Sequence, residues 1–436
     1  INSLYTGNPA QADDLALLST LPNALQLMID SSYEYSRKWL YQLSPPKTKV
    51  MMFTGKSNQG PPSRHSWKMG SHSIEMVQTY KHVGIVLSAD LTSMIRTDSA
   101  AKNMRSKFIA TVGHGIRPSG MNPLTAYKIL HKVVLPSVMF GCELWTSLTS
   151  KEYDKLEKSY RFCLKFALGT HMRTHTFMVH SLMGAGTIKE YIHQKQLSFL
   201  RRLIELPHDS VAYQVFLQRL MAYRLACTPQ PRGFVSHVYK MIHTYDLTQF
   251  MENYISDAEF PSKKPWSVIS RNSVENHNII TMDSYLSNQC KTISLFIHRG
   301  KGLPSNLLNA LKFHPEIKRE IMFMVKLAAH PTVTERPKCP VCSDDYESLA
   351  LHYLCTCVHT QERREAFWEI VTNLFDIRLA ALLNNISDEY FTSILLGGIM
   401  PEFTEIFQDS AQYFFFIKCA ARIYYDRKYT FHIQYT

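Results

Sequence analysis

The sequence predicts an α+β protein with a small antiparallel sheet, a mostly α-helical remainder and a small metal-binding element. Short apolar runs bounded by turn-forming residues fall within residues 1–95, and such runs are typical of strands. From about residue 95 onward, apolar residues recur at helical spacing. Cysteine and histidine residues at 339–357 have a spacing that suits a tetrahedral metal site.

Composition indicates a folded, basic protein. Its 436 residues are 45% hydrophobic and 12% aromatic, which is enough for several domains with real cores. The formal net charge of +12 favours polyanionic partners, nucleic acid before an acidic membrane surface. A basic surface without any such partner is the alternative.

No stretch of the sequence predicts a membrane span or a secretion signal. Every apolar run is shorter than the roughly 18 residues that a spanning helix needs, and the first cationic side chain is Arg37. We therefore expect an intracellular protein without a membrane partner, whose nine cysteines are free thiols or metal ligands. Because the chain begins at Ile1, we also expect a piece of a longer protein.

The expected elements of the first 95 residues alternate strands with one helix. The run "LALLS" at 15–19 predicts a buried strand, and Pro22 opens an amphipathic helix that ends before Pro45. The apolar face of this helix comprises Leu25, Met28, Ile29, Ser32, Ser36, Trp39, Leu40 and Leu43. A strand at 47–55 and a polar loop at 55–65 follow, and the runs 72–77 and 80–88 are close enough to pair as a hairpin.

The remainder is predicted to be helical. Asn122 suits an N-cap with Pro123 at the first helical position, and Pro136 marks a kink or stop in that helix. Further helices are expected at 151–168, 188–206, 210–226 and 304–330, and two helix-like segments end the chain, one of them at 410–428. Residues 228–275 are less regular and suit a connector.

Two adjacent aspartates, Asp13 and Asp14, pose the first chemical question. Their carboxylates repel each other unless a cation lies between them, so the pair indicates either a solvated turn or a divalent-metal site. At the tip of a tight hairpin, two carboxylates can hold Mg²⁺ ions that clamp the oxygens of a phosphoryl transfer. Such a site usually needs a third carboxylate, and the twelve residues before Asp13 offer no obvious candidate.

The second motif is Cys339-x₂-Cys342-x₉-His352-x₄-Cys357. Cysteines three positions apart can wrap one Zn²⁺ ion in a tight knuckle, and a histidine and a cysteine five positions apart can close the other side. Cys355 competes with Cys357 for the fourth position, and His359 is a more distant candidate. Four protein ligands leave no open coordination position, so the zinc would be structural.

Basic residues recur on the predicted helices, interleaved with aromatic residues. Lys158, Arg161 and Lys165 lie on one such helix, together with Tyr160 and Phe162. Cations attract backbone phosphates and aromatic faces stack on bases, so this pattern favours nucleic acid. Solvated helix faces over an ordinary core are the alternative for any one cluster.

Five segments carry a further pattern. They are "AQADDLALLS" (10–19), "RKWLYQLSPPKTKVMMFTG" (37–55), "YKHVGIVLS" (80–88), "LHKVVLPSVMFGCELW" (130–145) and "KLEKSYRFCLKFALG" (155–169). The first resembles the Tyr/Phe-Ala-Asp-Asp box of non-LTR (LINE-type) retrotransposon reverse transcriptases. The second resembles the following box of that family, with its Trp and Asn-Pro-x-Lys-Thr-Lys, and the third its Tyr-x-x-Leu-Gly hairpin. The last two resemble thumb segments, and the matches are weakest at 228–330.

The resemblance implies roles for individual residues. Asp13 and Asp14 would bind catalytic Mg²⁺, Lys47 would lie near the incoming triphosphate, and Tyr80 and Gly84 would belong to the primer-grip hairpin. The family's C-terminal Cys-Cys-His-Cys element favours Cys357 as the fourth zinc ligand. Three positions depart from the family pattern: Gln11 in place of Tyr or Phe, Ser44 in place of Asn, and Val83 in place of Leu.

The implied domains are a palm remnant with the primer-grip hairpin (1–95), a helical thumb (96–227), a helical connector (228–330), a zinc knuckle (331–365) and C-terminal helices (366–436). The family reaction is RNA-directed DNA synthesis. Its partners are an RNA template and a DNA target or primer, in a nuclear or cytoplasmic ribonucleoprotein. In the family, the fingers and a first palm aspartate precede the acidic pair, so we expect this chain to bind nucleic acid but to be inactive alone. The alternatives are a decayed or domesticated zinc-knuckle protein that binds nucleic acid without catalysis, and a basic protein-interaction scaffold.

Overall fold

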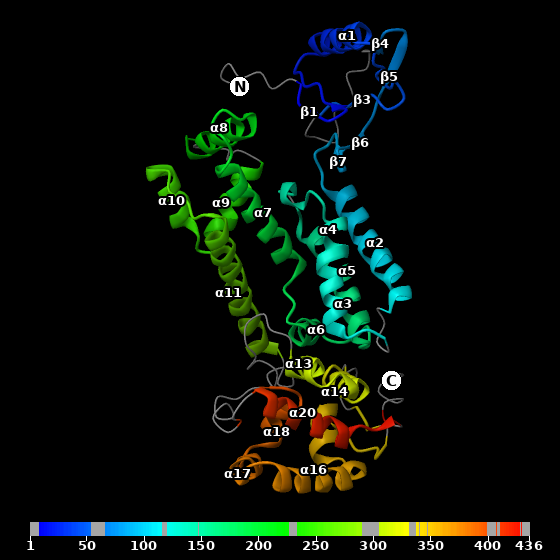
Figure 1. Ribbon diagram of the computed structural model, residues 1–436, viewed down its shortest axis with the longest axis vertical. Coiled ribbons are helices and arrows are strands. Elements are labelled where there is room, and N and C mark those ends of the chain that lie inside the picture. Colours follow the sequence, from blue (N-terminus) through cyan, green and yellow to red (C-terminus); the bar gives the residue numbers. More distant parts are fainter. Residues whose placement is uncertain are drawn as a thin grey trace. The chain divides into compact units, whose positions relative to one another are not determined.

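The computed structural model describes residues 8–53, 66–115, 120–146, 148–225, 233–289, 305–330, 337–339, 341–346, 348–398, 407, 410–427 and 429. The chain forms two compact units (Figure 1). The first comprises Ile1–Ala100, Met139–Lys155 and Ile192–Ser267, and the second comprises Ala101–Val138, Leu156–Tyr191 and Val268–Thr436. Each is described by itself.

The strands of the first unit form three small sheets. They are β1 (Ala10–Gln11), β2 (Asp14–Leu15), β3 (Lys49–Val50), β4 (Trp67–Met69), β5 (His72–Met76), β6 (Thr79–His82) and β7 (Ile85–Ser88). Strands β1 and β2 form an antiparallel ribbon, and so do β6 and β7. The third sheet has the order β3-β5-β4, in which β3 runs parallel to β5 and β4 antiparallel to it. Small sheets are thus present as predicted, but one pairing is parallel.

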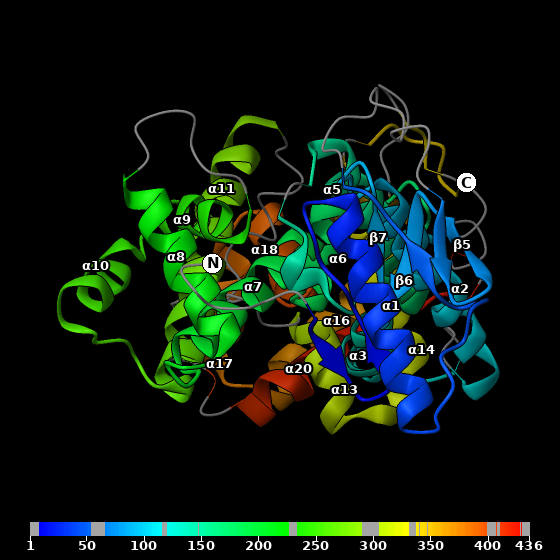
Figure 2. The ribbon, with the colours of Figure 1, turned by 90° about the horizontal axis from the view of Figure 1, so that it is seen from above.

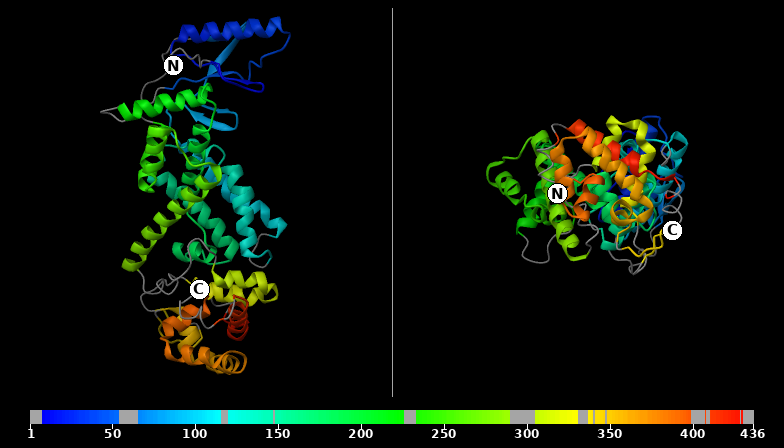
Figure 3. Two further views of the ribbon diagram at one scale, coloured as in Figure 1. Left: turned by 60° about the vertical axis from the view of Figure 1, so that its left-hand side comes forward. Right: turned by 90° about the horizontal axis from the view of Figure 1, so that it is seen from below.

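Helix α1 (Pro22–Lys38) packs on the three-stranded sheet and begins at the predicted proline (Figure 3). Their shared core consists of Ile29, Val50, Trp67, Met69 and Ile74, with Leu17, Leu25, Tyr33 and Leu43 packed against it. The predicted buried strand at 15–19 is wrong, because the β2 strand ends at Leu15 and Leu18 is 53% exposed. Only Leu17 of that run packs against the core, because a two-residue strand followed by coil presents no continuous apolar face.

The predicted pairing of 72–77 with 80–88 is also wrong. Strand β5 pairs with β4 instead, through a turn at Gly70, whose φ of +59° suits glycine. The run 80–88 folds back on itself as the β6–β7 hairpin, because Val83 and Gly84 both take positive φ, at +47° and +80°. Two consecutive positive φ values are typical of the two-residue hairpin turn whose own twist matches the right-handed twist of the flanking strands. The polar loop predicted at 55–65 lies outside the described residues.

Helices make up most of the rest of the described chain. They begin with α2 (Met94–Ala110), α3 (Pro123–Ile129), α4 (Leu135–Val138), α5 (Ser150–Leu168), α6 (Thr176–Met183), α7 (Ile188–Ile204), α8 (Val211–Leu225), α9 (Phe234–Thr244), α10 (Thr248–Asp257) and α11 (Lys263–Gln289). Figure 2 shows α8, α9 and α10 as neighbours. Residues 228–275 are more regular in their described part than the sequence predicted, which agrees with a helical connector. Helix α9 buries Val235, Val238 and Ile242 at helical spacing, and α9, α10 and α11 each contain Ser or Pro residues of this stretch.

The predicted helix start at Asn122 and Pro123 is confirmed. The Asn122 side chain accepts a hydrogen bond of 2.8 Å from the backbone N–H of Leu124, with Pro123 at the first helical position. The helix widens into a π turn over Leu130–Val134 before continuing as α4 around Pro136. A widened turn accommodates the proline, whose ring and missing N–H do not fit a regular α-helical turn.

The C-terminal part of the second unit is also helical. It contains α13 (Asn306–Phe313), α14 (Lys318–Ala328), α15 (Leu349–Leu351), α16 (Gln361–Leu374), α17 (Ile377–Asn385), α18 (Asp388–Leu395) and α20 (Ser410–Tyr424). Helix α20 packs against α13, α14 and α16, and its Phe416 and Tyr424 lie beside Phe367. Helices α13 and α14 lie within the predicted helical stretch 304–330. At the end of the described chain α16, α17, α18 and α20 are present where two helix-like segments were predicted, because short turns separate α16, α17 and α18. None of the described helices combines the length and the apolar character needed to cross a bilayer.

Candidate metal centre and nucleic-acid interface

The acidic pair lies at a hairpin turn. Strands β1 and β2 flank a two-residue turn of Ala12 and Asp13, in which Ala12 has a φ of +52°, and Asp14 is the first residue of β2. Both aspartate side chains are exposed. Within the described part of the chain, no third carboxylate, imidazole or thiol completes a metal-binding group with them. The hairpin position suits the predicted role, and magnesium binding remains a prediction.

Two of the other predicted site residues are linked directly. The Tyr80 hydroxyl donates a hydrogen bond of 2.8 Å to the backbone carbonyl of Lys47. Lys47 ends a turn in which its N–H and that of Thr48 donate to the Ser44 carbonyl. The bond therefore attaches strand β6 to the turn before β3 and leaves the Lys47 side chain exposed. A lysine held by its backbone and free at its ammonium group is suited to binding an anion.

Both the positive φ at position 84 and the small space around it favour a residue without a Cβ atom. A Cβ atom on Gly84 would lie 3.1 Å from Cε1 of Phe140. Reciprocally, a Cβ on Gly141, whose φ is +75°, would lie 3.2 Å from Cγ1 of Ile85. Two glycines on segments far apart in sequence thus allow the hairpin tip to approach the Phe140–Gly141 turn closely.

The four predicted zinc ligands come together. The ligand atoms of Cys339, Cys342, His352 and Cys357 all lie within 4.8 Å of one another. Sulfurs that share one tetrahedral Zn²⁺ at about 2.3 Å lie roughly 3.8 Å apart, so the cluster has the size that the ion needs. Three thiols and one imidazole form a soft donor set that fits zinc and leaves no open position. The residues therefore fit a structural metal ion such as zinc.

Local backbone structure positions the first two cysteines. The backbone N–H of Cys339 donates to the Asp344 carbonyl at 2.8 Å, and the Ser343 N–H donates to the Cys339 carbonyl at 3.0 Å. Ser343 takes a positive φ of +65° to close this turn. A β-bridge between Lys338 and Asp345 extends the turn into a short hairpin, which holds Cys339 and Cys342 on one side.

A π turn positions the other two ligands. It spans His352–Thr356, and the N–H of Cys357 donates to the His352 carbonyl at 2.7 Å. The His352 Nδ1 atom lies 3.0 Å from the Thr356 hydroxyl, and its Nε2 atom lies 3.2 Å from Sγ of Cys342. A hydrogen bond at Nδ1 fixes the ring orientation and leaves Nε2 for a metal. Burial lowers the pKa of His352, which favours the neutral, ligating form.

The pKa values of the three thiols diverge. Burial raises the pKa of Cys342 and of Cys357. Burial also opposes ionisation of Cys339, but hydrogen bonds from the backbone N–H of Cys342 and from the Tyr429 hydroxyl outweigh it and lower the pKa of that thiol. Adjacent thiolates repel one another, so a cation at the centre is needed to keep all three ionised.

The π turn also decides whether Cys357 or Cys355 is the fourth member of the cluster. Cys355 points away from the cluster: its Sγ lies 3.3 Å from the Thr392 hydroxyl and 3.6 Å from the Asp388 carbonyl at the start of α18. Burial raises the pKa of the Cys355 thiol to about 11, which keeps it protonated. Cys357 therefore belongs to the cluster and Cys355 packs against a neighbouring helix.

Residues far along the chain support the cluster, and the sequence analysis did not identify them. The Tyr429 hydroxyl lies 3.4 Å from Sγ of Cys339, and the Tyr429 ring lies 4.4 Å from that of Tyr353. Arg363 donates to the carbonyls of Ile423 and Tyr425 and pairs with Asp426 at 3.2 Å. The metal centre is thus joined to the end of α20, and no local spacing signal could have shown this contact.

The three basic residues predicted on α5 differ in their surroundings. Lys158 is exposed. Arg161 donates to the Thr176 hydroxyl at 2.8 Å, and Lys165 donates to the Met172 carbonyl at 2.6 Å. Burial and the nearby Arg161 guanidinium lower the pKa of Lys165. Two of the three cations therefore donate hydrogen bonds within the protein, and among the described residues only Lys158 makes no such bond.

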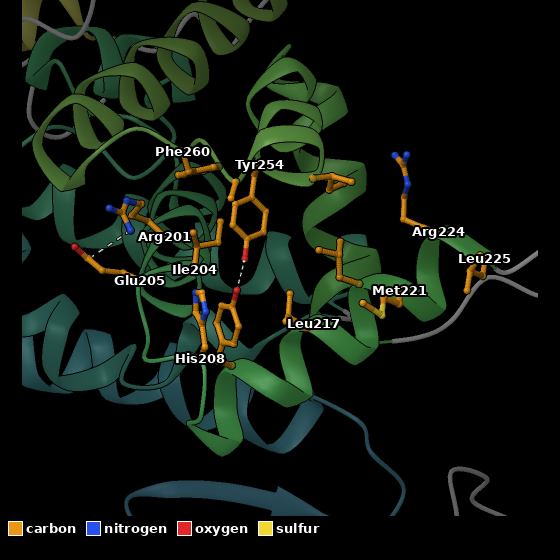
Figure 4. Close-up of a pocket in the computed structure, with 14 residues that line it drawn as sticks. Arg201, Ile204, Glu205, His208, Leu217, Met221, Arg224, Leu225, Tyr254 and Phe260 are labelled. Carbon is orange, nitrogen blue, oxygen red and sulfur yellow. Dashed lines mark hydrogen bonds and ion pairs between the residues drawn. The ribbon is translucent and has the colours of Figure 1, made fainter. Parts of the chain in front are cut away.

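A cavity of about 590 Å³ lies in the first unit among α7, α8 and α10 (Figure 4). Apolar side chains dominate its wall, including Leu217, Met221 and Phe260. The hydroxyls of Tyr213 and Tyr254 hydrogen-bond to each other at 3.2 Å. The cations at its rim are paired, since Arg224 lies 2.8 Å from Glu252 and Arg201 lies 3.4 Å from Glu205. Both arginines among the described lining residues are therefore already paired with a carboxylate.

No family model matches this chain, and no significant match was found to a curated protein or to a solved structure.

Proposed function

We propose that the chain is part of a retrotransposon RNA-directed DNA polymerase and that it binds nucleic acid. The position of Asp13 and Asp14 carries this proposal. They lie at the turn of an antiparallel hairpin that leads into a helix-on-sheet core and then into a glycine-containing hairpin. This order of elements agrees with the resemblance in sequence, and the +12 net charge favours a polyanion.

The same geometry favours binding over catalysis by this chain. Mg²⁺ keeps its waters unless several oxygen ligands displace them, and two exposed carboxylates are a weak site. Among the residues that the structure describes, nothing completes the pair. A decayed or domesticated nucleic-acid-binding protein is therefore the second candidate.

The proposed role of zinc is structural. The cluster is largely buried and offers four ligands, so bound zinc has no position for substrate. In this proposal the metal stabilises the C-terminal region, and Lys158 contributes to an electrostatic attraction for phosphates.

A primer–template assay tests the proposal. We expect residues 1–436 to bind a DNA primer annealed to an RNA template, with an affinity that falls steeply as salt concentration rises. We expect no primer extension with Mg²⁺ and deoxynucleotides. Extension that disappears in Asp13→Ala would show that the chain is a complete catalyst. Binding that is absent, or insensitive to salt, would favour the protein-interaction scaffold.

A longer gene product separates the two candidates. If upstream sequence supplies the missing carboxylate, primer extension appears in the longer product and is lost on Asp14→Asn. A longer product that binds the primer–template equally well but never extends it would support the domesticated binder.

A further inference from the structure

Three aromatic side chains gather on the surface at the end of α1. Tyr35, Trp39 and Tyr41 are 57%, 60% and 46% exposed. The ring centroids of Tyr35 and Trp39 are 6.0 Å apart, and those of Tyr35 and Tyr41 are 6.4 Å apart. Single exposed apolar residues are ordinary, but here the ring of Tyr35 lies beside both of the others, so the three rings form a defined surface. We call these three residues the aromatic platform.

A strained backbone turn builds this platform. Leu40 has a φ of +56° and is 94% exposed, although glycine is the usual residue in this conformation at the end of a helix. The Leu40 N–H donates to the Arg37 carbonyl, and the Tyr41 N–H donates to the Ser36 carbonyl at 3.1 Å. This reversal brings Tyr41 back beside Tyr35. Helical spacing predicts Trp39 and Leu40 on the core face of a longer helix, but the turn directs both side chains outward.

Positive charge is interleaved with the rings. Arg37 and Lys38 lie between Tyr35 and Trp39 in sequence and are both exposed. Glu34 lies 4.0 Å from Arg37, at the limit of an ion pair, and both side chains are largely in water. Lys38 makes no ion pair with any described residue. The platform therefore combines aromatic faces with at least one free cation.

We propose that the aromatic platform binds single-stranded nucleic acid by stacking bases on Trp39 and the two tyrosines. Exposed rings accept the faces of unpaired bases, and the adjacent ammonium and guanidinium groups attract the phosphates between them. A protein partner fits less well, because an apolar interface would have to desolvate Lys38, a residue type that is depleted at such interfaces. Paired bases present no free faces, so the platform selects single strands.

This inference does not depend on the polymerase proposal. It rests on exposed rings, a strained turn and local charge. Arg37, Lys38, Trp39 and Tyr41 also lie in the 37–55 segment that resembles the family, but the resemblance gives none of them a role in binding bases. The two proposals are tested with different probes: a primer–template duplex for the first and an unpaired oligonucleotide for the second.

Fluorescence anisotropy with a labelled twelve-nucleotide oligouridylate is the direct test. We expect Trp39→Leu to weaken binding about tenfold, because loss of one stacking ring typically costs that much, and Trp39→Phe to stay close to wild type. The matched control is Tyr390→Ala, which removes a ring of 44% exposure that lies outside the platform. If Trp39→Leu binds the oligouridylate as tightly as the wild type does, the proposal is overturned, because an aliphatic contact would then be enough for binding.

Salt dependence separates stacking from charge. Lys38→Gln should reduce the slope of log affinity against log salt by about 0.7, the value for one phosphate contact on a single strand, whereas Trp39→Leu should lower affinity and leave the slope unchanged. If the wild-type protein binds the duplex but not the oligouridylate, the platform is refuted while the polymerase proposal stands. If it binds the oligouridylate through Trp39 but does not bind the duplex, the platform stands and the polymerase proposal is weakened.

Discussion

Leu40 shows at the level of one residue how a backbone conformation can cost stability. A side chain at positive φ brings Cβ close to the carbonyl oxygen, which costs about 1 kcal/mol, and glycine avoids this contact. We expect Leu40→Gly to raise the free energy of unfolding by about 0.5–1 kcal/mol in a urea titration. Leu27→Gly is the matched control. Leu27 is also exposed, at 68%, but lies inside α1, so glycine there should lower stability by about 1 kcal/mol.

At Gly84, in contrast to Leu40, the native residue is already the one that suits a positive φ. Its φ is +80°, and a Cβ would lie 3.1 Å from the Phe140 ring. Gly84→Ala should therefore lower the free energy of unfolding by about 1–2 kcal/mol, through backbone strain and displacement of the ring. Gly113→Ala is the control, because no atom lies within 4 Å of the added Cβ. Equal stability of the two variants would show that the β6–β7 tip does not rest on Phe140.

At the level of elements, a buried ion pair joins α5 to α6. Nε2 of His180 lies 3.0 Å from Oε1 of Glu157, and both side chains are largely buried. Burial opposes both charges, but the attraction within the ion pair and the groups around it together outweigh burial, so the pKa of His180 is raised and that of Glu157 is lowered. The neighbouring Glu190 further favours the His180 cation, and Arg161 further favours the Glu157 anion.

The pair predicts a pH dependence of stability. The contribution of His180 is complete below about pH 6.5 and is lost as pH rises through its higher folded-state pKa. The contribution of Glu157 is present above about pH 4.5 and is lost as pH falls. Urea titrations at pH 5.5 and pH 8 should therefore show wild-type stability falling at pH 8, with a smaller fall in His180→Gln. His114→Gln, an exposed control, should keep the wild-type difference.

The Cys339–Cys342–His352–Cys357 cluster permits a test that distinguishes neighbouring cysteines as zinc ligands. Cys357 belongs to the cluster, whereas Cys355 contacts Thr392. Mass spectrometry of the intact protein should find one zinc ion in the wild type and in Cys355→Ser, and much less in Cys357→Ser, because a hydroxyl is a poor substitute for a thiolate. Zinc that is lost from Cys355→Ser and retained by Cys357→Ser would reverse the ligand assignment.

Across the whole molecule, local chemistry was predictable from sequence and long-range pairing was not. The Asn122 cap and the start of α1 at Pro22 depend on adjacent residues, and both were anticipated. The Cys-Cys-His-Cys spacing also predicted the cluster of four ligands correctly, because the two residues of each ligand pair are close in sequence. The parallel pairing of β3 with β5 joins strands separated by many residues, so no local pattern could specify it.

The errors at the surface have a similar cause. Helical spacing placed Trp39 and Leu40 in the core, but α1 ends at Lys38, and the positive φ of Leu40 then changes the direction of the chain. A positive φ at leucine is rare enough that no sequence rule predicts it. Tyr429 was missed as a support for the metal centre because 90 positions separate it from Cys339.

That separation affects how the protein is made. At about 5–20 residues per second, a ribosome needs roughly 5–18 s to add the 90 residues from Cys339 to Tyr429. Throughout this interval Cys339 has been synthesised, whereas the tyrosine that will lie beside it has not. If the cluster binds zinc, the four ligands can therefore take up the ion before the contact with Tyr429 forms, and the tyrosine would then close over a centre that is already assembled.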